Sequence, residues 1–123
     1  MPPIRTTVVG SYPVPEWLRM MPSGPNLRDA ILVVMKTQEL AGIDVISDGE
    51  LTRFDVNFPD ANGMIDYFVH PMDGIGREAT RAELDAFHSN PAFEFRPRPA
   101  GVVRGPIGPG TLDLISTYES VRG

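Results

Sequence analysis

The chain has 123 residues, a net charge of -5 and no cysteine, and these totals exclude several classes of protein. The length allows one domain, because domains typically hold about 100–200 residues. Hydrophobic residues at 41% and charged residues at 22% are the balance of a folded globular chain. The negative charge and the lack of a Lys/Arg run argue against nucleic acid as a partner. Without cysteine there are no disulfides, thiol nucleophiles or thiolate zinc ligands.

Targeting and metal-binding signals are also weak. No apolar stretch approaches the roughly 20 residues that span a bilayer, so we expect no membrane segment. The stretch MPPIRTTVV lacks the long apolar segment of a signal peptide, which predicts a cytoplasmic protein. His70 and His88 stand alone in the sequence, and a metal site within this chain would need mainly carboxylates. We predict none.

The first predicted element is a strand over residues 4–9, where β-branched residues run up to Gly10. Residues 11–26 are rich in proline, which predicts a loop with one short turn around residues 16–18. A second short strand is predicted over residues 43–47, followed by a turn at Asp48-Gly49.

The helix between these strands is predicted over residues 27–41, with Asn26 as its N-cap and Asp29 as a capping-box partner. Gly42 follows at the left-handed C′ position. Strand, helix and strand with short connections form a βαβ unit, which predicts a parallel pair of strands with a right-handed crossover. The helix should pack through an apolar stripe made of Leu27, Ile31, Val34 and Met35.

The second half of the chain alternates short elements with turn signals. One helix stands out, at residues 81–88, with Thr80 as N-cap and Glu83 as the reciprocal capping-box partner. The other predicted elements are a helical turn at 64–68, a Gly-rich turn at 73–74, a strand or hairpin arm at 93–96, a strand at 100–104, a turn at 107–110 and a helix at 112–121 with Thr111 as N-cap.

Two polar turns follow the two strands of the βαβ unit, namely Gly10-Ser11 and Asp48-Gly49-Glu50. Ligands of parallel βα folds bind beyond the carboxyl ends of the strands. Adjacent strands lie about 4.8 Å apart, so we expect these turns to be neighbours. The Gly-Ser turn offers N–H groups and a hydroxyl to a carboxylate, and Glu50 offers an anion to an ammonium group. Together they would complement a zwitterionic amino acid.

Structural explanations of the same residues stay open at this point. Ser11 could satisfy backbone donors within its own turn. Glu50 could be a solvated carboxylate or could pair with Arg53, three residues later. Asp48 is expected to stabilise its own Asp-Gly turn rather than to bind a ligand.

Several stretches resemble the catalytic barrel of cobalamin-independent methionine synthase and its relatives. They are TTVVGSYP (6–13), QELAG (38–42), IDVISDGELTRFD (43–55), DYF (66–68), DG (73–74) and PAGVVRGPIGPGTLDL (99–114). The resemblance implies an α/β fold, a partial TIM (β/α)8 barrel that comprises its first two or three βα units with a hairpin or helical insertion. Residues 1–123 would then form a single truncated barrel domain.

The resemblance also implies a function. The family transfers a methyl group from 5-methyltetrahydrofolate to the thiol of homocysteine, which is activated on zinc. By position, Gly10, Ser11 and Glu50 match the residues that hold the amino-acid end of homocysteine. The family's zinc ligands and general-acid histidine lie in a later part of the barrel, so no catalytic or metal-binding residue is assigned here. We therefore expect an enzyme chain that is inactive alone.

A partial barrel would expose the edge of its sheet and the apolar faces of its helices. We therefore expect self-association or a complementary chain. Two other functions remain open: a related zinc-dependent enzyme that alkylates another thiol, such as coenzyme M, and a non-catalytic fragment or interaction subunit. Because coenzyme M carries no ammonium group, Glu50 favours an amino-acid thiol.

Overall fold

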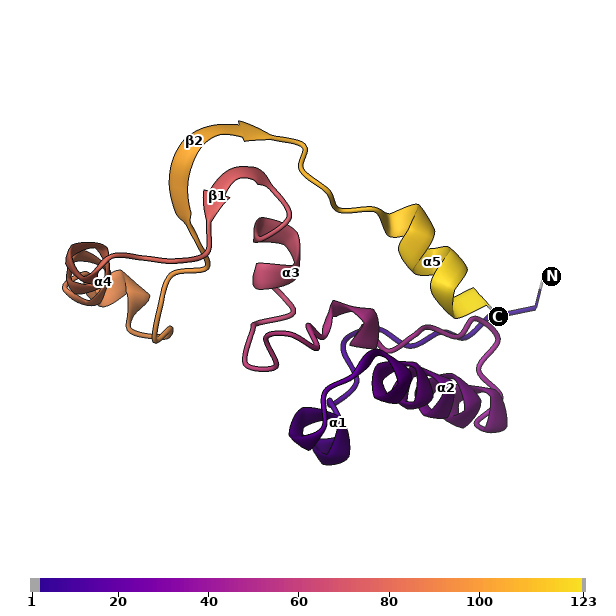
Figure 1. Cartoon of the computed structure of the whole chain (residues 1–123). Helices are drawn as coiled ribbons and strands as arrows, with labels where there is room; N and C mark the ends of the chain where they lie inside the picture. The colour runs from indigo at the N-terminus through magenta and orange to yellow at the C-terminus, as the bar shows by residue number, and fades with distance from the viewer. Residues whose placement is uncertain (1–2, 123) are drawn as a thin grey trace. The chain divides into compact units, whose positions relative to one another are not determined.

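A computed structural model describes residues 3–122, and their contacts divide the chain into two compact units (Figure 1). The first unit runs to Ala61 and takes in the chain from Leu114 onward, and the second is Asn62–Asp113. Each unit is described by itself. Within residues 3–122, no helix combines the length and apolar character that crossing a membrane requires.

The first unit is built around α2, Gly24–Leu40, with α1 at Glu16–Met20, the 3-10 helix η1 at Leu51–Arg53 and α5 at Leu114–Arg122. The short α1 confirms the turn predicted near residues 16–18. Helix α5 begins two residues later than predicted, so Thr111 lies outside it.

Helix α2 begins earlier than the sequence predicted. Its N-cap is Ser23, whose hydroxyl accepts a hydrogen bond from the Asn26 N–H at 3.2 Å. Asn26 therefore lies inside the first turn, and the predicted cap at Asn26 with Asp29 as partner is wrong. Pro25 explains the earlier start, because a proline needs no hydrogen-bond acceptor in the first turn of a helix.

The C-terminal end of α2 agrees with prediction. Gly42 has a φ of 75° and donates to the Glu39 carbonyl at 3.0 Å, while the Ile43 N–H donates to the Gln38 carbonyl at 3.1 Å. These two bonds satisfy carbonyl groups that the end of a helix leaves without partners.

The two predicted strands of the βαβ unit are much shorter than expected. They form one isolated parallel bridge between Thr7 and Val45. Alongside it, the Asp44 carboxylate accepts hydrogen bonds from the Thr6 N–H at 2.8 Å and from the Thr6 hydroxyl at 2.9 Å. These bonds hold the pKa of Asp44 below its ordinary value, the backbone N–H having the larger effect. The parallel direction is as predicted, and the partial barrel stays a prediction.

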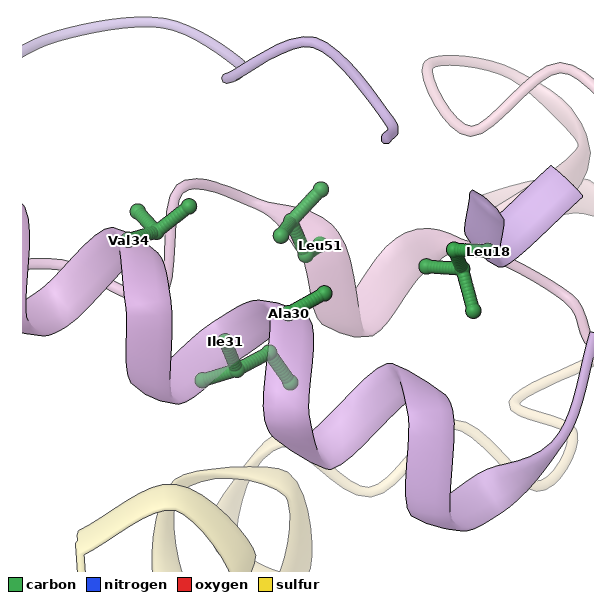
Figure 2. Packing of buried hydrophobic residues seen from close by; sticks show 5 residues of the cluster. All are labelled: Leu18, Ala30, Ile31, Val34 and Leu51. Atoms are coloured by element: carbon green, nitrogen blue, oxygen red, sulfur yellow. The ribbon is translucent and has the colours of Figure 1, made fainter. Parts of the chain in front are cut away.

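The core of the first unit lies between α2, α1 and η1. Figure 2 shows Ala30, Ile31 and Val34 on α2, with Leu51 of η1 and Leu18 of α1 nearby. All five are buried, which confirms Ile31 and Val34 of the predicted stripe. Leu27 and Met35 pack against this cluster from its margin.

Other apolar side chains of α2 are exposed: Leu32 is 53%, Val33 60% and Leu40 78% accessible. Ile4 and Val9, which belong to the first predicted strand, are 93% and 96% accessible. The first unit thus carries apolar surface on two of its segments, because Thr7 and Val45 make just one bridge and residues 3–61 form no wider sheet.

The second unit contains an antiparallel pair of strands, β1 at Asp73–Gly76 and β2 at Val102–Gly108, which Figure 1 shows curving alongside one another. Asp73 pairs with Gly108 and Gly76 with Val102, with an irregularity between Asp73 and Ile75. The predicted Gly-rich turn at residues 73–74 is therefore wrong. The predicted strand at 100–104 exists but extends into the stretch predicted as a turn at 107–110.

Three short helices complete this unit: α3 at Asp66–Val69, α4 at Arg81–His88 and the 3-10 helix η2 at Pro91–Phe93. Helix α4 confirms the predicted bounds and capping box. The predicted strand at 93–96 is wrong, because Pro91 at the start of η2 turns the chain and the Phe93 ring stacks on Phe87, with ring centroids 5.0 Å apart.

Candidate functional site

The turn that carries Glu50 is held by Asp48. One oxygen of its carboxylate accepts the Glu50 N–H at 2.9 Å, and the other accepts the Thr52 hydroxyl at 2.5 Å. The Asp48 carbonyl also accepts the Leu51 N–H at 3.3 Å. Asp48 therefore has the structural role that the sequence analysis favoured for it.

Gly49 brings the two loops into contact. It is buried, its φ is 66°, and an added Cβ would lie 2.8 Å from Val34 Cγ1 and 3.0 Å from Tyr12 Cβ. The Gly49 carbonyl accepts the Tyr12 N–H at 2.9 Å. A side chain at this position would push the turn away from both α2 and the loop that contains Ser11.

A polar residue of α2 that the sequence analysis missed also holds this turn. Gln38 is 1% exposed, and its amide bonds both backbone groups of Ser47. Its Nε2 donates to the Ser47 carbonyl at 2.9 Å, and its Oε1 accepts the Ser47 N–H at 2.9 Å. A polar residue among the apolar positions of a helix was the available signal.

The two predicted site loops meet at Glu50. The Ser11 hydroxyl donates a hydrogen bond to Glu50 Oε2, across 39 positions of sequence. Arg53 also donates to Glu50 Oε2, at 3.0 Å, with both side chains about one-quarter exposed. The expected proximity of the two turns is thus confirmed, and so is the Glu50–Arg53 pairing considered as an alternative.

The geometry leaves part of Glu50 available. Both contacts fall on Oε2, and Oε1 accepts no hydrogen bond from residues 3–122. A carboxylate has about four lone-pair sites, so Glu50 can accept further donors without losing these two. Glu50 also has a φ of 59°, and among the described residues no other non-glycine residue has a positive φ. Such backbone conformations cost energy and occur often at ligand sites.

Gly10 and Ser11 lie on the exposed side of this contact. Gly10 has a φ of 97°, and an added Cβ would meet no atom within 4 Å. The Ser11 hydroxyl is directed at Glu50 rather than outward. For Ser11 to bind a substrate carboxylate through its hydroxyl, as the sequence analysis expected, it would have to exchange the bond to Glu50 for one to the ligand.

The described residues do not fit a zinc site. Within residues 3–122, no three His, Asp or Glu side chains are grouped so that they could hold a metal. His70 Nε2 lies 2.8 Å from the Ala100 carbonyl oxygen, and His88 Nε2 lies 2.7 Å from that of Pro97. Both rings are therefore engaged with backbone groups of the second unit.

A separate buried cluster surrounds Asp66 in the second unit. Its carboxylate accepts the Asn62 N–H at 2.7 Å and an Arg96 N–H at 3.1 Å, and His70 Nε2 lies 3.9 Å away. These contacts tie α3 to the segment before β2, which gives the cluster a structural role.

Sequence comparison finds similarity to curated proteins named methionine synthase. The chain is 34% identical to that of Sulfurisphaera tokodaii over 87 residues, covering 61% of this chain and 23% of the relative. It is 33% identical over 87 residues to that of Saccharolobus islandicus, covering 61% and 24%. For Sulfolobus acidocaldarius the identity is 33% over 82 residues, covering 57% and 22%.

The chain thus spans about a quarter of the length of these curated relatives, at 22–24% of each. No family model matches the chain, and no solved structure matches it. What the comparisons establish is a partial similarity to methionine synthases, over somewhat more than half of this chain.

Proposed function

We propose that this chain takes part in the transfer of a methyl group from 5-methyltetrahydrofolate to homocysteine, in methionine biosynthesis. Its share is to hold the amino-acid end of the thiol substrate. Glu50 binds the substrate ammonium, and the Gly10-Ser11 turn binds the substrate carboxylate. The observation that carries the proposal is the hydrogen bond from Ser11 to Glu50, which unites two distant loops of a chain similar to methionine synthases.

The charges around Glu50 are compatible with this role. Arg53 donates to Oε2 of the same carboxylate, and because both side chains are only about one-quarter exposed, we expect a ligand to share the carboxylate with Arg53 rather than to displace it. An ammonium group bound to Oε1 displaces neither existing donor. The substrate carboxylate then takes the Ser11 hydroxyl, whose single proton cannot serve both partners.

The proposal assigns substrate recognition to this chain and no step at a metal. Zinc is the cofactor of the family that the chain resembles, and the described residues do not fit it. Since the chain spans about a quarter of its relatives, the methyl donor and the metal belong, in this proposal, to further polypeptide that acts with residues 1–123. A (β/α)8 barrel typically needs about 250 residues, which agrees with that division.

The proposal is tested by titrating the chain with L-homocysteine, with coenzyme M and with 3-aminopropanethiol, which keeps the amine and lacks the carboxylate. Backbone NMR detects weak binding through the amides of residues 10–12 and 48–53. We expect homocysteine to shift these signals, 3-aminopropanethiol to bind more weakly and coenzyme M not to bind. Stronger binding of coenzyme M would favour the thiol-alkylating alternative, and no binding of any thiol would contradict the proposal.

The matched variants are Glu50→Gln and Glu39→Gln. Glu39→Gln removes the same charge from an exposed part of α2, where the partner of Glu39 is Lys36 at 3.0 Å. Glu50→Gln should weaken homocysteine binding by about 1–3 kcal/mol, the scale of a lost charge-assisted hydrogen bond. Glu39→Gln should leave binding unchanged. Equal affinity in wild type and Glu50→Gln would make Glu50 a surface ion-pair residue.

A further inference from the structure

Gln38 lies on the buried face of α2, next to residues that are otherwise apolar. Its neighbours on this face, Ala30, Ile31 and Val34, form the core with Leu51 (Figure 2). Burying an amide among apolar side chains is unfavourable unless its donors and acceptor are all bonded. Those of Gln38 are bonded, since Nε2 also lies 3.3 Å from the Val34 carbonyl in addition to the two Ser47 bonds.

The two Ser47 bonds are those that a neighbouring strand would make. A residue in a β-ladder exchanges an N–H and a C=O with its partner strand, and Gln38 supplies both groups from a single side chain. The bonds fix Ser47 along the direction of residues 43–47. The Gln38 side chain thus reaches both backbone atoms of Ser47 at 2.9 Å.

From Ser47, hydrogen bonds continue to the ligand-binding groups. The Ser47 hydroxyl accepts the Gly49 N–H at 3.2 Å, and the Gly49 carbonyl accepts the Tyr12 N–H at 2.9 Å. Tyr12 follows Ser11, and Glu50 follows Gly49. The position of Ser47 therefore sets where both partners of the Ser11–Glu50 contact stand, through three hydrogen-bonded residues.

We propose that Gln38 is a positioning residue of the amino-acid site: it touches no ligand and holds the Ser47–Glu50 turn at the place where Glu50 meets Ser11. This inference rests on the proposed function for its effect on binding. Its structural part, the placement of the turn against Tyr12, stands on the hydrogen bonds alone.

The test compares Gln38→Met with Ile31→Val. Methionine has a volume close to that of glutamine and removes every amide hydrogen bond, whereas Ile31→Val trims the same buried face without touching Ser47. Two quantities are measured in each variant: exchange protection of the Tyr12 amide, and affinity for homocysteine by NMR titration. Gln38→Met should lower both by about 10- to 100-fold, as a misplaced binding group or a lost supporting partner does.

Ile31→Val should change neither quantity by more than about twofold, since exchange of a locally held amide reports local opening. Exchange protection of the Tyr12 amide, measured without any ligand, separates the two proposals. If wild type binds no homocysteine, the proposed function fails, while loss of Tyr12 protection in Gln38→Met still shows that Gln38 places the turn.

Two results would overturn the inference. One is Gln38→Met with wild-type protection at Tyr12 and wild-type affinity. The other is a general loss of folding: if Gln38→Met and the shorter Gln38→Asn both unfold while Ile31→Ala stays folded, Gln38 is a stability residue without a specific positioning role. Gln38→Asn that folds with both quantities intermediate between wild type and Gln38→Met would support the inference.

Discussion

Two glutamate–arginine pairs in this chain are chemically alike and structurally different. In the first unit, Glu50 pairs with Arg53 at 3.0 Å. In the second, Glu83 pairs with Arg104 through two bonds, at 2.6 and 2.9 Å. The two pairs differ in what else each carboxylate does.

Glu83 is committed to the backbone around it. Its Oε2 accepts the Thr80 N–H at 2.8 Å and the Thr80 hydroxyl at 3.0 Å, which completes the capping box of α4. Arg104 in turn donates to the Glu78 carbonyl at 2.9 Å, so the pair ties α4 to β2. Every contact of Glu83 therefore supports the fold.

The side chain of Glu50 does not cap a helix. Among residues 3–122, no backbone N–H donates to its carboxylate and no donor reaches its Oε1, and its own N–H, at a residue with positive φ, donates to Asp48. The contacts of Glu50 are with two side chains, those of Ser11 and Arg53, whereas Glu83 also binds the backbone N–H of a helix cap. That asymmetry separates a carboxylate suited to a ligand from one that belongs to the structure.

The largest expected effect comes from disturbing the turn that carries Glu50. Gly49→Ala adds a Cβ at 2.8 Å from Val34 Cγ1 at a φ of 66°. Overpacking and the left-handed backbone together should lower the free energy of unfolding by about 2–4 kcal/mol. Denaturant unfolding, followed by amide exchange within α2, measures this change.

The control for Gly49→Ala is Gly105→Ala in β2, where an added Cβ meets no atom within 4 Å and φ is not positive. This variant should be neutral or stabilised by up to about 1 kcal/mol. If Gly49→Ala lowered the free energy of unfolding no more than Gly105→Ala does, the turn would not hold Glu50 in a fixed position. The contrast between the two carboxylates would then lose its basis.

A smaller effect is expected at the cap of α4. Thr80→Ala removes the hydroxyl that accepts the Glu83 N–H at 3.3 Å, and N-cap losses of this kind cost about 0.5–2 kcal/mol. Amide exchange within residues 81–88 should report the loss, and Thr80→Ser should restore most of the protection. Unchanged protection in Thr80→Ala would show that Arg104 and the Thr80 N–H, which the variant keeps, hold Glu83 without the hydroxyl.

Signals carried by neighbouring residues were predictable from the sequence. The Thr80–Glu83 capping box and the Gly42 helix end depend on residues a few positions apart, and the structure has both. The Asp48-Gly49 turn belongs to the same class. The predicted N-cap of α2 was wrong because Ser23 and Asn26 are both residue types that cap helices well, and Pro25 favours the earlier of the two.

Features that depend on distant partners were predicted less well. Residues 4–9 and 43–47 are rich in β-branched residues, which predicts strands. A strand also needs a neighbouring strand to pair with, and these two segments share a single parallel bridge. The proximity of Ser11 and Glu50 was still correct, because one parallel bridge suffices to align the two turns. Gln38 was missed because its role depends on Ser47, nine residues away. The roles of Gly10, Ser11 and Glu50 as ligand groups stay predictions.

The smallest expected effect is the acid dependence of the Glu83 pair. Hydrogen bonds from Arg104, and then from the Thr80 N–H, hold the pKa of Glu83 at about 2, against 4.5 without these contacts. Because the folded-state pKa is the lower one, folding is favoured by ionised Glu83 above about pH 4.5. That contribution is lost progressively as the pH falls from 4.5 toward 2.

The ring signals of Phe87 and Phe93, which stack between α4 and η2, report unfolding of this region as the pH is lowered. Glu83→Gln cannot ionise, so its unfolding should depend less on pH than that of wild type in this window, and the difference should disappear below pH 2. Glu94→Gln changes an exposed carboxylate in the same unit and should follow wild type. A parallel acid response in wild type and Glu83→Gln would remove Glu83 from the structural side of the comparison, because a carboxylate committed to the fold must lose that role when it is protonated.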